Sequence, residues 1–129
     1  MLFCDIPWLP EKIPVALVSG GTHKLLCLLL GIATFPKGVI LIDELENGFY
    51  YKALPKVWEA LFAFCRKFDV QIFVSTHSKE CVDSILPVLK GHEKQFRLLR
   101  AERKNGHRAI KTFRGEEFEA AIKQDVEIR

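Results

Sequence analysis

The chain has 129 residues, of which 49% are hydrophobic and 27% are charged. This length suits one small domain, and the composition excludes an intrinsically disordered chain. The formal net charge of +3 is too small to indicate a nucleic-acid-binding protein by itself.

The first eighteen residues are expected to form an extended lead-in. Residues 2–6 and 13–18 favour short extended segments on either side of a proline-rich turn. Asp5 and the lack of basic residues before Pro10 argue against a signal peptide. The longest apolar run, residues 25–35, is too short to cross a bilayer, so we expect no membrane partner.

The cysteines point to a reducing compartment. Cys4, Cys27, Cys65 and Cys81 lack the CxxC or Cys/His spacing that is typical of zinc sites. They lie in apolar runs, where a free cysteine behaves as a small hydrophobic residue. Unpatterned thiols without a secretory signal predict a cytoplasmic protein.

A helix and a strand are predicted after the lead-in. Residues 19–22, with the sequence Ser-Gly-Gly-Thr, favour a flexible loop ending in a helix cap. Residues 23–35 favour a helix buried on most sides, and Pro36 ends it. Residues 39–42 are an unbroken Val-Ile-Leu-Ile run, typical of a strand covered on both faces in a parallel sheet.

Two further helices and a second strand follow. Apolar residues recur at helical spacing over residues 50–68, with Pro55 in the first turn. Residues 70–74 predict a second buried strand. Ser78 can cap a third helix, and Pro87 marks its end.

The C-terminal part predicts a hairpin and a last helix. Residues 96–99 and 109–113 flank an Asn-Gly pair at 105–106, a strong hairpin signal. Residues 115–123 favour a helix. The order strand–helix–strand–helix and then a hairpin predicts an α/β fold with parallel central strands.

Positive charge is concentrated in the stretch that contains the hairpin. Two readings are open: the solvated face of a strand pair, which we favour, and a nucleic-acid-binding patch. Phe96 and Phe113 are the only aromatic residues there, too few for a base-stacking platform. The basic residues are Lys90, Lys94, Arg97, Arg100, Arg103, Lys104, Arg108, Lys111 and Arg114, opposed by Glu93 and Glu102.

Polar residues follow both predicted strands where those strands end. Asp43 and Glu44 come after the first, and residues 75–78, Ser-Thr-His-Ser, come after the second. In open parallel sheets, ligands bind at this edge. The loop at 19–22 precedes a helix whose free N–H groups and dipole favour an anion. Each feature alone is an ordinary loop or helix cap, but together they form the set that Mg²⁺–nucleotide chemistry requires.

In this order and spacing the motifs resemble the second half of an ABC-type ATPase domain. The matching segments are residues 18–24, 39–48 and 70–78. The nearest branch is the OLD-like and RecF/SMC-like AAA ATPases, in which the Walker B strand is followed by D-E-x-E-N-G. The resemblance implies a P-loop NTPase-like partial parallel sheet with flanking helices, a closing hairpin and a C-terminal helix. We expect one partial domain over 1–129, made of the lead-in (1–18), a core with the three motifs (19–90) and the hairpin and helix (91–129).

The resemblance also implies roles for individual residues. Asp43 corresponds to the Walker B aspartate, which holds Mg²⁺ through its water shell. Glu44 corresponds to the general base that polarises the attacking water, and His77 to the switch histidine that contacts the γ-phosphate of ATP. Asn47 lies in the D-loop of a dimer interface. The signature loop, which contacts the γ-phosphate of ATP held by a second protomer, corresponds to Ser19, Gly20 and Gly21.

One expected motif is not found in the sequence. The P-loop pattern G-x-x-x-x-G-K-[ST], whose backbone and lysine hold the phosphates of ATP, has no match. Most of the electrostatic stabilisation of the transferred phosphoryl group would come from that loop. We therefore expect that this chain alone does not bind ATP tightly.

Three hypotheses about function follow from these observations. The first is part of an ATPase, a truncated product or one half of a split domain, whose P-loop comes from a missing N-terminal part or a partner. The second is a non-catalytic module that docks on an intact ATPase and regulates it. The third is a DNA-binding accessory module that uses the basic stretch, and its affinity would fall steeply with salt.

Overall fold

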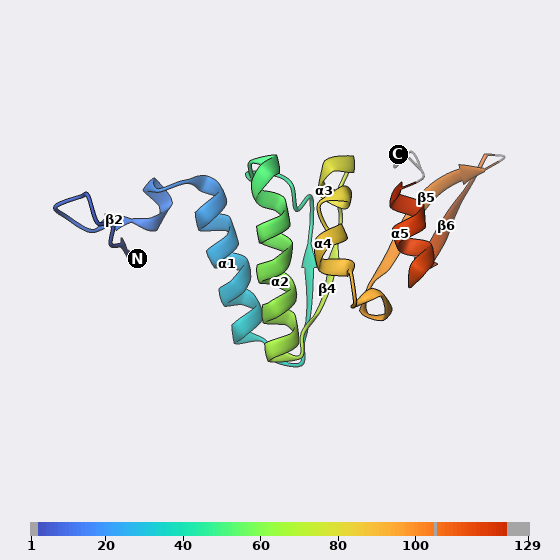
Figure 1. The fold of residues 1–129 in the computed structure, drawn as a ribbon, viewed down its shortest axis with the longest axis horizontal. Coiled ribbons are helices and arrows are strands. Elements are labelled where there is room, and N and C mark those ends of the chain that lie inside the picture. The colour runs from blue at the N-terminus through green and yellow to red at the C-terminus, as the bar shows by residue number, and fades with distance from the viewer. Residues whose placement is uncertain (1–2, 105, 124–129) are drawn as a thin grey trace.

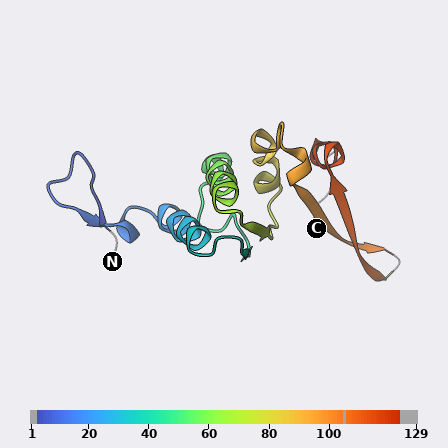
Figure 2. The same ribbon diagram turned by 90° about the horizontal axis from the view of Figure 1, so that it is seen from below.

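A computed structural model describes residues 3–104 and 106–123. The elements are strung out along the chain, with the N-terminal lead-in and the C-terminal hairpin at opposite ends of an elongated molecule (Figure 1; Figure 2). The strands are β1 (Phe3–Cys4), β2 (Ile13–Pro14), β3 (Val39–Ile42), β4 (Gln71–Val74), β5 (Arg97–Lys104) and β6 (His107–Arg114). The α-helices are α1 (Gly20–Thr34), α2 (Leu54–Phe68), α3 (Lys79–Asp83), α4 (Leu86–Leu89) and α5 (Glu116–Lys123).

Each strand of the described residues pairs with one other strand. β3 and β4 are parallel and in register from Val39 opposite Gln71 to Ile42 opposite Val74. β5 and β6 form an antiparallel hairpin, and β1 and β2 form a short antiparallel pair. The predicted α/β fold with parallel central strands and a closing hairpin is confirmed in this arrangement. The division into residues 1–18, 19–90 and 91–129 stays a prediction.

The start of α1 differs from the sequence-based expectation. Residues 20–22 are not a flexible loop but the first turn of the helix. Ser19 is the N-cap, and its hydroxyl accepts a hydrogen bond from the Thr22 N–H at 3.0 Å. Because a side-chain acceptor satisfies one of the free N–H groups of the first turn, the helix can include both glycines despite their low helix propensity.

The other helix boundaries show where proline acts. α2 begins at Leu54 with Pro55 in its first turn, as predicted, and a 3₁₀ helix, Tyr51–Ala53, precedes it. Pro87 does not end a helix but lies in the first turn of α4, a separate short helix after α3. A missing N–H does little harm at that position, because first-turn N–H groups have no partner within the helix.

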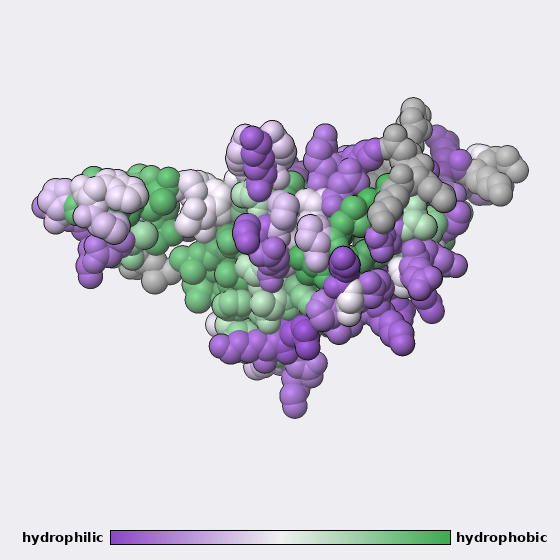
Figure 3. Space-filling model, viewed as in Figure 1, coloured by the Kyte–Doolittle hydropathy of each residue, from purple (hydrophilic) through white to green (hydrophobic). Residues whose placement is uncertain are grey.

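The core lies among α2, β3, β4, α3, α4 and α5. Leu45, Leu54, Leu61, Cys81 and Leu89 are fully buried there. From α1, whose apolar sequence predicted a helix buried on most sides, only Ile32 is fully buried. That expectation was wrong for the described residues, since Leu25, Leu28 and Leu29 are only partly buried against the core and Leu30 is exposed. Apolar surface is accordingly visible on the face shown in Figure 3.

The central sheet is covered on one face only. Ile40, Ile42 and Ile72 pack against the core. On the opposite face the side chains of Val39 and Leu41 are 60% and 78% exposed, and that of Phe73 is 46% exposed. The prediction that these strands are buried on both faces is therefore wrong for this chain by itself. Side chains alternate between the two faces of a strand, so one row of apolar residues needs a cover that the described residues do not provide.

A groove separates this sheet from the hairpin. Its volume is about 1310 Å³, and it is lined on one side by β4, including Ile72 and Phe73, and on the other by β5, including Leu98 and Arg100. Within residues 3–104 and 106–123, β4 pairs with β3 only and β5 with β6 only, so both strands present unpaired backbone groups on their other edges. The carboxyl end of β4 brings Ser75, Thr76 and His77 to the same groove.

Candidate functional site

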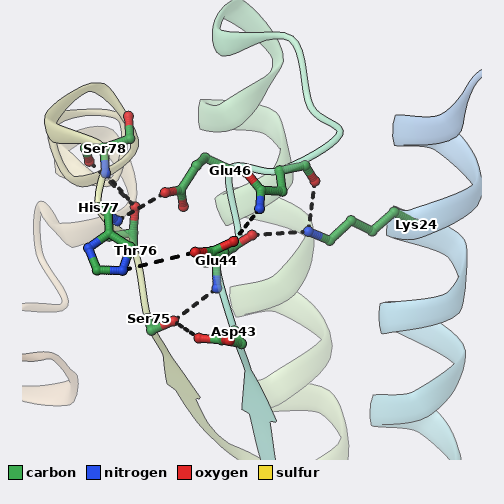
Figure 4. Close-up of polar contacts among 9 residues, drawn as sticks. Lys24, Asp43, Glu44, Glu46, Ser75, Thr76, His77 and Ser78 are labelled. Carbon is green, nitrogen blue, oxygen red and sulfur yellow. Dashed lines mark hydrogen bonds and ion pairs between the residues drawn. The ribbon is translucent and has the colours of Figure 1, made fainter.

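Asp43 and Ser75 meet where β3 and β4 end (Figure 4). The Ser75 hydroxyl donates a hydrogen bond to Oδ1 of Asp43 and accepts one from the Glu44 N–H at 2.9 Å. The parallel ladder continues beyond the strands, because the Ser75 N–H donates to the Ile42 carbonyl at 2.9 Å and the Leu45 N–H donates to the Ser75 carbonyl at 3.1 Å. The loop after β3 and the loop after β4 are thus joined by hydrogen bonds directly at the ends of the two strands.

Glu44 points its carboxylate toward His77 (Figure 4). Oε1 of Glu44 lies 4.0 Å from Nε2 of His77, and the Asn47 side-chain amide donates a hydrogen bond to Oε2. The Glu44 side chain is 46% exposed and that of His77 is 80% exposed, so both are open to a ligand. Glu44 has φ of 45°, in the left-handed region that non-glycine residues rarely adopt. Such backbone strain is often found at functional sites, where neighbouring contacts maintain it.

Glu46, in the loop after β3, binds the backbone of the loop after β4. Its Oε1 accepts a hydrogen bond from the His77 N–H at 2.9 Å. Its Oε2 is buried and makes no hydrogen bond of normal geometry to the described residues. Burial raises the pKa of the Glu46 carboxyl, but interaction with the Thr76 hydroxyl and the His77 N–H lowers it by more, so the pKa lies below its usual value. A charged Glu46 therefore anchors His77 from the opposite loop.

Lys24 connects α1 to the loop after β3. Its ammonium donates to the backbone carbonyls of Glu44, Leu45 and Asn47 at 3.2, 3.1 and 2.8 Å. One turn earlier, Gly21 lies directly against the same loop, since a Cβ at this position would be 2.8 Å from the carbonyl oxygen of Gly48. The first turns of α1 are thereby fixed to the loop that carries Glu44.

The predicted site residues fall into two groups in the structure. Asp43, Glu44, Asn47 and His77 form one cluster through the contacts described above. The signature loop is apart from it: within the described residues no hydrogen bond joins the side chain of Ser19 to this cluster. Ser19 and Gly20 lie exposed at the start of α1, and only Gly21 contacts the loop beyond the acidic pair. The roles assigned to these residues by resemblance stay predictions.

The donor set suits a hard cation in part. Asp43, Glu44 and Ser75 offer oxygen atoms, the ligands that Mg²⁺ prefers. Among the described residues no group of three or more His, Cys, Asp or Glu side chains could enclose a metal ion. Mg²⁺ is commonly held by one or two carboxylates, waters and the phosphates of a nucleotide, and Asp43 fits a site of that kind.

A comparison with known protein families shows to which family the chain belongs. Residues 11–83 match the family described as "AAA domain, putative AbiEii toxin, Type IV TA system". The chain belongs to this AAA family. The match begins within the lead-in and ends before the hairpin and α5, so it covers α1 and the strands and loops that build the cluster. The coarse part of the sequence-based prediction, an AAA-type ATPase domain, is confirmed.

A curated relative has a name that concerns nucleotides. This protein, from Helicobacter pylori (strain ATCC 700392 / 26695), is named "ATP/GTP phosphatase" and is 27% identical to this chain over 89 residues. The alignment covers 67% of this chain and 24% of the relative, so the chain spans about a quarter of that protein's length. No solved structure matches the chain.

The structure adds residues that the sequence analysis left without a role. Ser75 was noted only as part of a polar run, and Glu46 only as a position within the matching segment 39–48. Lys24 is the only Lys, Arg, Asp or Glu residue of α1, and that isolated charge in an apolar helix was a usable signal. Among the described residues, no helix combines the length and hydropathy that membrane crossing requires.

Proposed function

We propose that this chain supplies the hydrolytic half of an AAA-type ATPase and works with a P-loop that another segment or polypeptide provides. The observation that carries the proposal is the orientation of Glu44. Its carboxylate follows β3 directly and lies between the Asn47 amide and the imidazole of His77. Family membership and the name of the Helicobacter pylori relative support nucleotide hydrolysis as the reaction.

In the proposed reaction Glu44 accepts a proton from the water that attacks the γ-phosphate of ATP. A general base must reach the attacking water, and Glu44 is half-exposed with one oxygen held by Asn47. His77 lies within 4.0 Å of that carboxylate and is open to a phosphate oxygen. Asp43 would hold Mg²⁺ through its waters, and Mg²⁺ when bound would neutralise charge on the phosphates.

Two features support a complementing segment. The apolar face of the sheet, with Val39, Leu41 and Phe73, is exposed, and β4 and β5 have unpaired edges on either side of a groove. Parallel sheets are covered on both faces in complete domains. The P-loop-bearing segment would therefore complete the sheet and place the phosphates at the ends of β3 and β4. In a two-protomer ATPase sandwich, Ser19, Gly20 and Gly21 would contact the nucleotide of the second protomer.

The proposal is tested by measuring phosphate release. The chain would be co-expressed with a polypeptide encoded next to it that carries G-x-x-x-x-G-K-[ST]. We expect turnover by the pair and none by the chain alone. Glu44→Gln should lower kcat by about 10²- to 10⁴-fold, the usual contribution of a general base. The matched control is Glu59→Gln, an exposed glutamate of α2 that pairs with Lys56. Equal turnover by the Glu44→Gln pair and the wild-type pair would refute the assignment.

A further inference from the structure

Lys24 is a side chain for which neither the sequence motifs nor the proposed reaction supplies a role. It lies on α1, one helical turn after Gly21, and is partly buried. Its ammonium makes three hydrogen bonds, all to backbone carbonyls of the loop that follows β3. An ammonium has three N–H donors, so this geometry uses each of them. The Phe49 ring, 5.3 Å away from the ammonium, adds a cation–π contact from the end of the same loop.

Two of the three carbonyls belong to residues that determine where the Glu44 carboxylate points. The first belongs to Glu44 itself, and it also accepts the Asn47 N–H at 3.1 Å. The third belongs to Asn47, whose side-chain amide holds the Glu44 carboxylate. Lys24 therefore fixes the backbone of Glu44 and the backbone of the residue that orients its side chain.

The loop that Lys24 binds has a backbone conformation that is unfavourable for most residues. Glu44 has φ of 45° and Gly48 has φ of 85°, so the loop has left-handed residues near both ends. A left-handed non-glycine residue persists only where its surroundings favour it. A cation that binds three carbonyls at once provides such surroundings, because each carbonyl must point toward the same nitrogen.

We infer that Lys24 is a positioning residue for the hydrolytic reaction, which holds the 44–49 loop so that the Glu44 carboxylate faces His77. The catalytic part of this inference rests on the proposed function. Lys24 and Gly21 belong to the same rigid helix, so a displacement of the signature loop at the start of α1 moves the carbonyl-binding ammonium with it. Lys24 thereby couples the position of residues 19–21 to the orientation of Glu44.

The first arm of the test needs neither nucleotide nor partner. Backbone hydrogen exchange is measured on the full chain for wild type, Lys24→Met and Lys24→Arg. We expect faster exchange of the Asn47 and Phe49 N–H groups in Lys24→Met, while β3 keeps wild-type protection and Lys24→Arg restores most of the loop protection. Both N–H groups donate within the loop, to Glu44 and Glu46, at 3.1 Å. Lys56→Met is the matched control, because the Lys56 side chain is 82% exposed and pairs only with Glu59 in the described residues.

The second arm measures ATP turnover by the pair with the P-loop-bearing polypeptide. Lys24→Met should lower kcat about tenfold or more with little change in KM, since misplacing a catalytic group affects the reaction more than binding. Lys24→Arg should recover part of the loss, because it keeps the charge in a different geometry. If Lys24→Met does not fold, Lys24→Gln, which can still donate to one or two carbonyls, is compared with Lys24→Arg, and exchange should be slower in the arginine variant.

The two arms separate the two claims. Unchanged exchange at Asn47 and Phe49 in Lys24→Met, or a wild-type kcat in an active pair, would overturn the role of Lys24. A wild-type pair without turnover would overturn the proposed function, and the exchange arm would still decide whether Lys24 holds the loop.

Discussion

Gly21 of α1 and Gly48 of the loop after β3 are in direct backbone contact, close enough that a Cβ on Gly21 would lie 2.8 Å from the Gly48 carbonyl oxygen. The Phe49 ring would be 3.3 Å from the same Cβ. The second glycine of the Ser-Gly-Gly motif is thus required by packing within the chain, apart from any contact with a nucleotide. The Ser-Gly-Gly segment and the loop after β3 therefore form one structural unit.

Gly21→Ala should therefore destabilise the chain. The added methyl group meets backbone, which cannot rotate away, and overpacking of this kind costs about 1–3 kcal/mol, more than the helix propensity that alanine gains. The free energy of unfolding in urea measures the effect. Gly31→Ala is the matched control, because a Cβ there meets nothing within 4 Å, and it should stabilise α1 by up to about 1 kcal/mol. A Gly21→Ala variant as stable as Gly31→Ala would contradict the contact.

Glu46 should make stability depend on pH in the acid range. Its pKa in the folded chain is lowered below the usual 4.5, so the charged form contributes stability above the unfolded pKa. This contribution is lost as the pH falls through the folded pKa. In urea unfolding from pH 7 to pH 3, Glu46→Gln should therefore reduce the acid-induced loss of stability, whereas Glu59→Gln should not. Identical pH profiles for wild type and Glu46→Gln would contradict the anchor to His77.

Trp58 connects α2 to α3 through a hydrogen bond as well as by packing. Its indole N–H donates to the Cys81 carbonyl and the Ser84 hydroxyl, both at 3.0 Å, and the side chain is buried. Trp58→Phe should lower the free energy of unfolding by about 1–3 kcal/mol, because volume and a buried donor are lost together. Trp8→Phe, at a residue that is 82% exposed, should change it by less than about 0.5 kcal/mol. Equal effects would show that the Trp58 contacts contribute nothing.

Leu41 should affect assembly more than folding. Its side chain is 78% exposed on the open face of the sheet, so Leu41→Lys should leave the free energy of unfolding of the chain within about 0.5 kcal/mol of wild type. If the P-loop-bearing segment covers this face, the same change should abolish co-purification of the pair. Ile110→Lys, at a residue of β6 that is 72% exposed, should leave co-purification intact. Retention of the partner by Leu41→Lys would contradict the proposed cover.

The local elements followed well from the sequence. The run at residues 39–42 is a strand, Pro55 lies in the first turn of α2, and the turn that includes Gly106 joins the two strands of the hairpin, with φ of 81° at that glycine. These features depend on hydrophobic pattern and on the backbone freedom of single residues, both of which are readable locally. Asn105, the other half of the hairpin signal, lies outside the described residues.

The burial of side chains and the contacts between them were harder to predict from the sequence. The apolar sequence of α1 and of β3 predicts full cover, but cover depends on partners that a single segment does not specify, and here Leu30, Leu41 and Phe35 stay exposed. The cluster of Asp43, Glu44 and His77 was predictable because parallel strands end at one edge. The contacts of Lys24 with three carbonyls depend on the path of the loop, which the sequence does not reveal.

The central claim, that Glu44 is the base for ATP hydrolysis, is tested most directly by a single-turnover experiment on the pair. Labelled ATP is bound to the pair carrying wild-type chain or Glu44→Gln, and the conversion of bound ATP to ADP is followed with time. We predict that Glu44→Gln binds ATP as tightly as wild type and retains it unhydrolysed, while wild type converts it. Conversion at the wild-type rate by the Glu44→Gln pair would contradict the account.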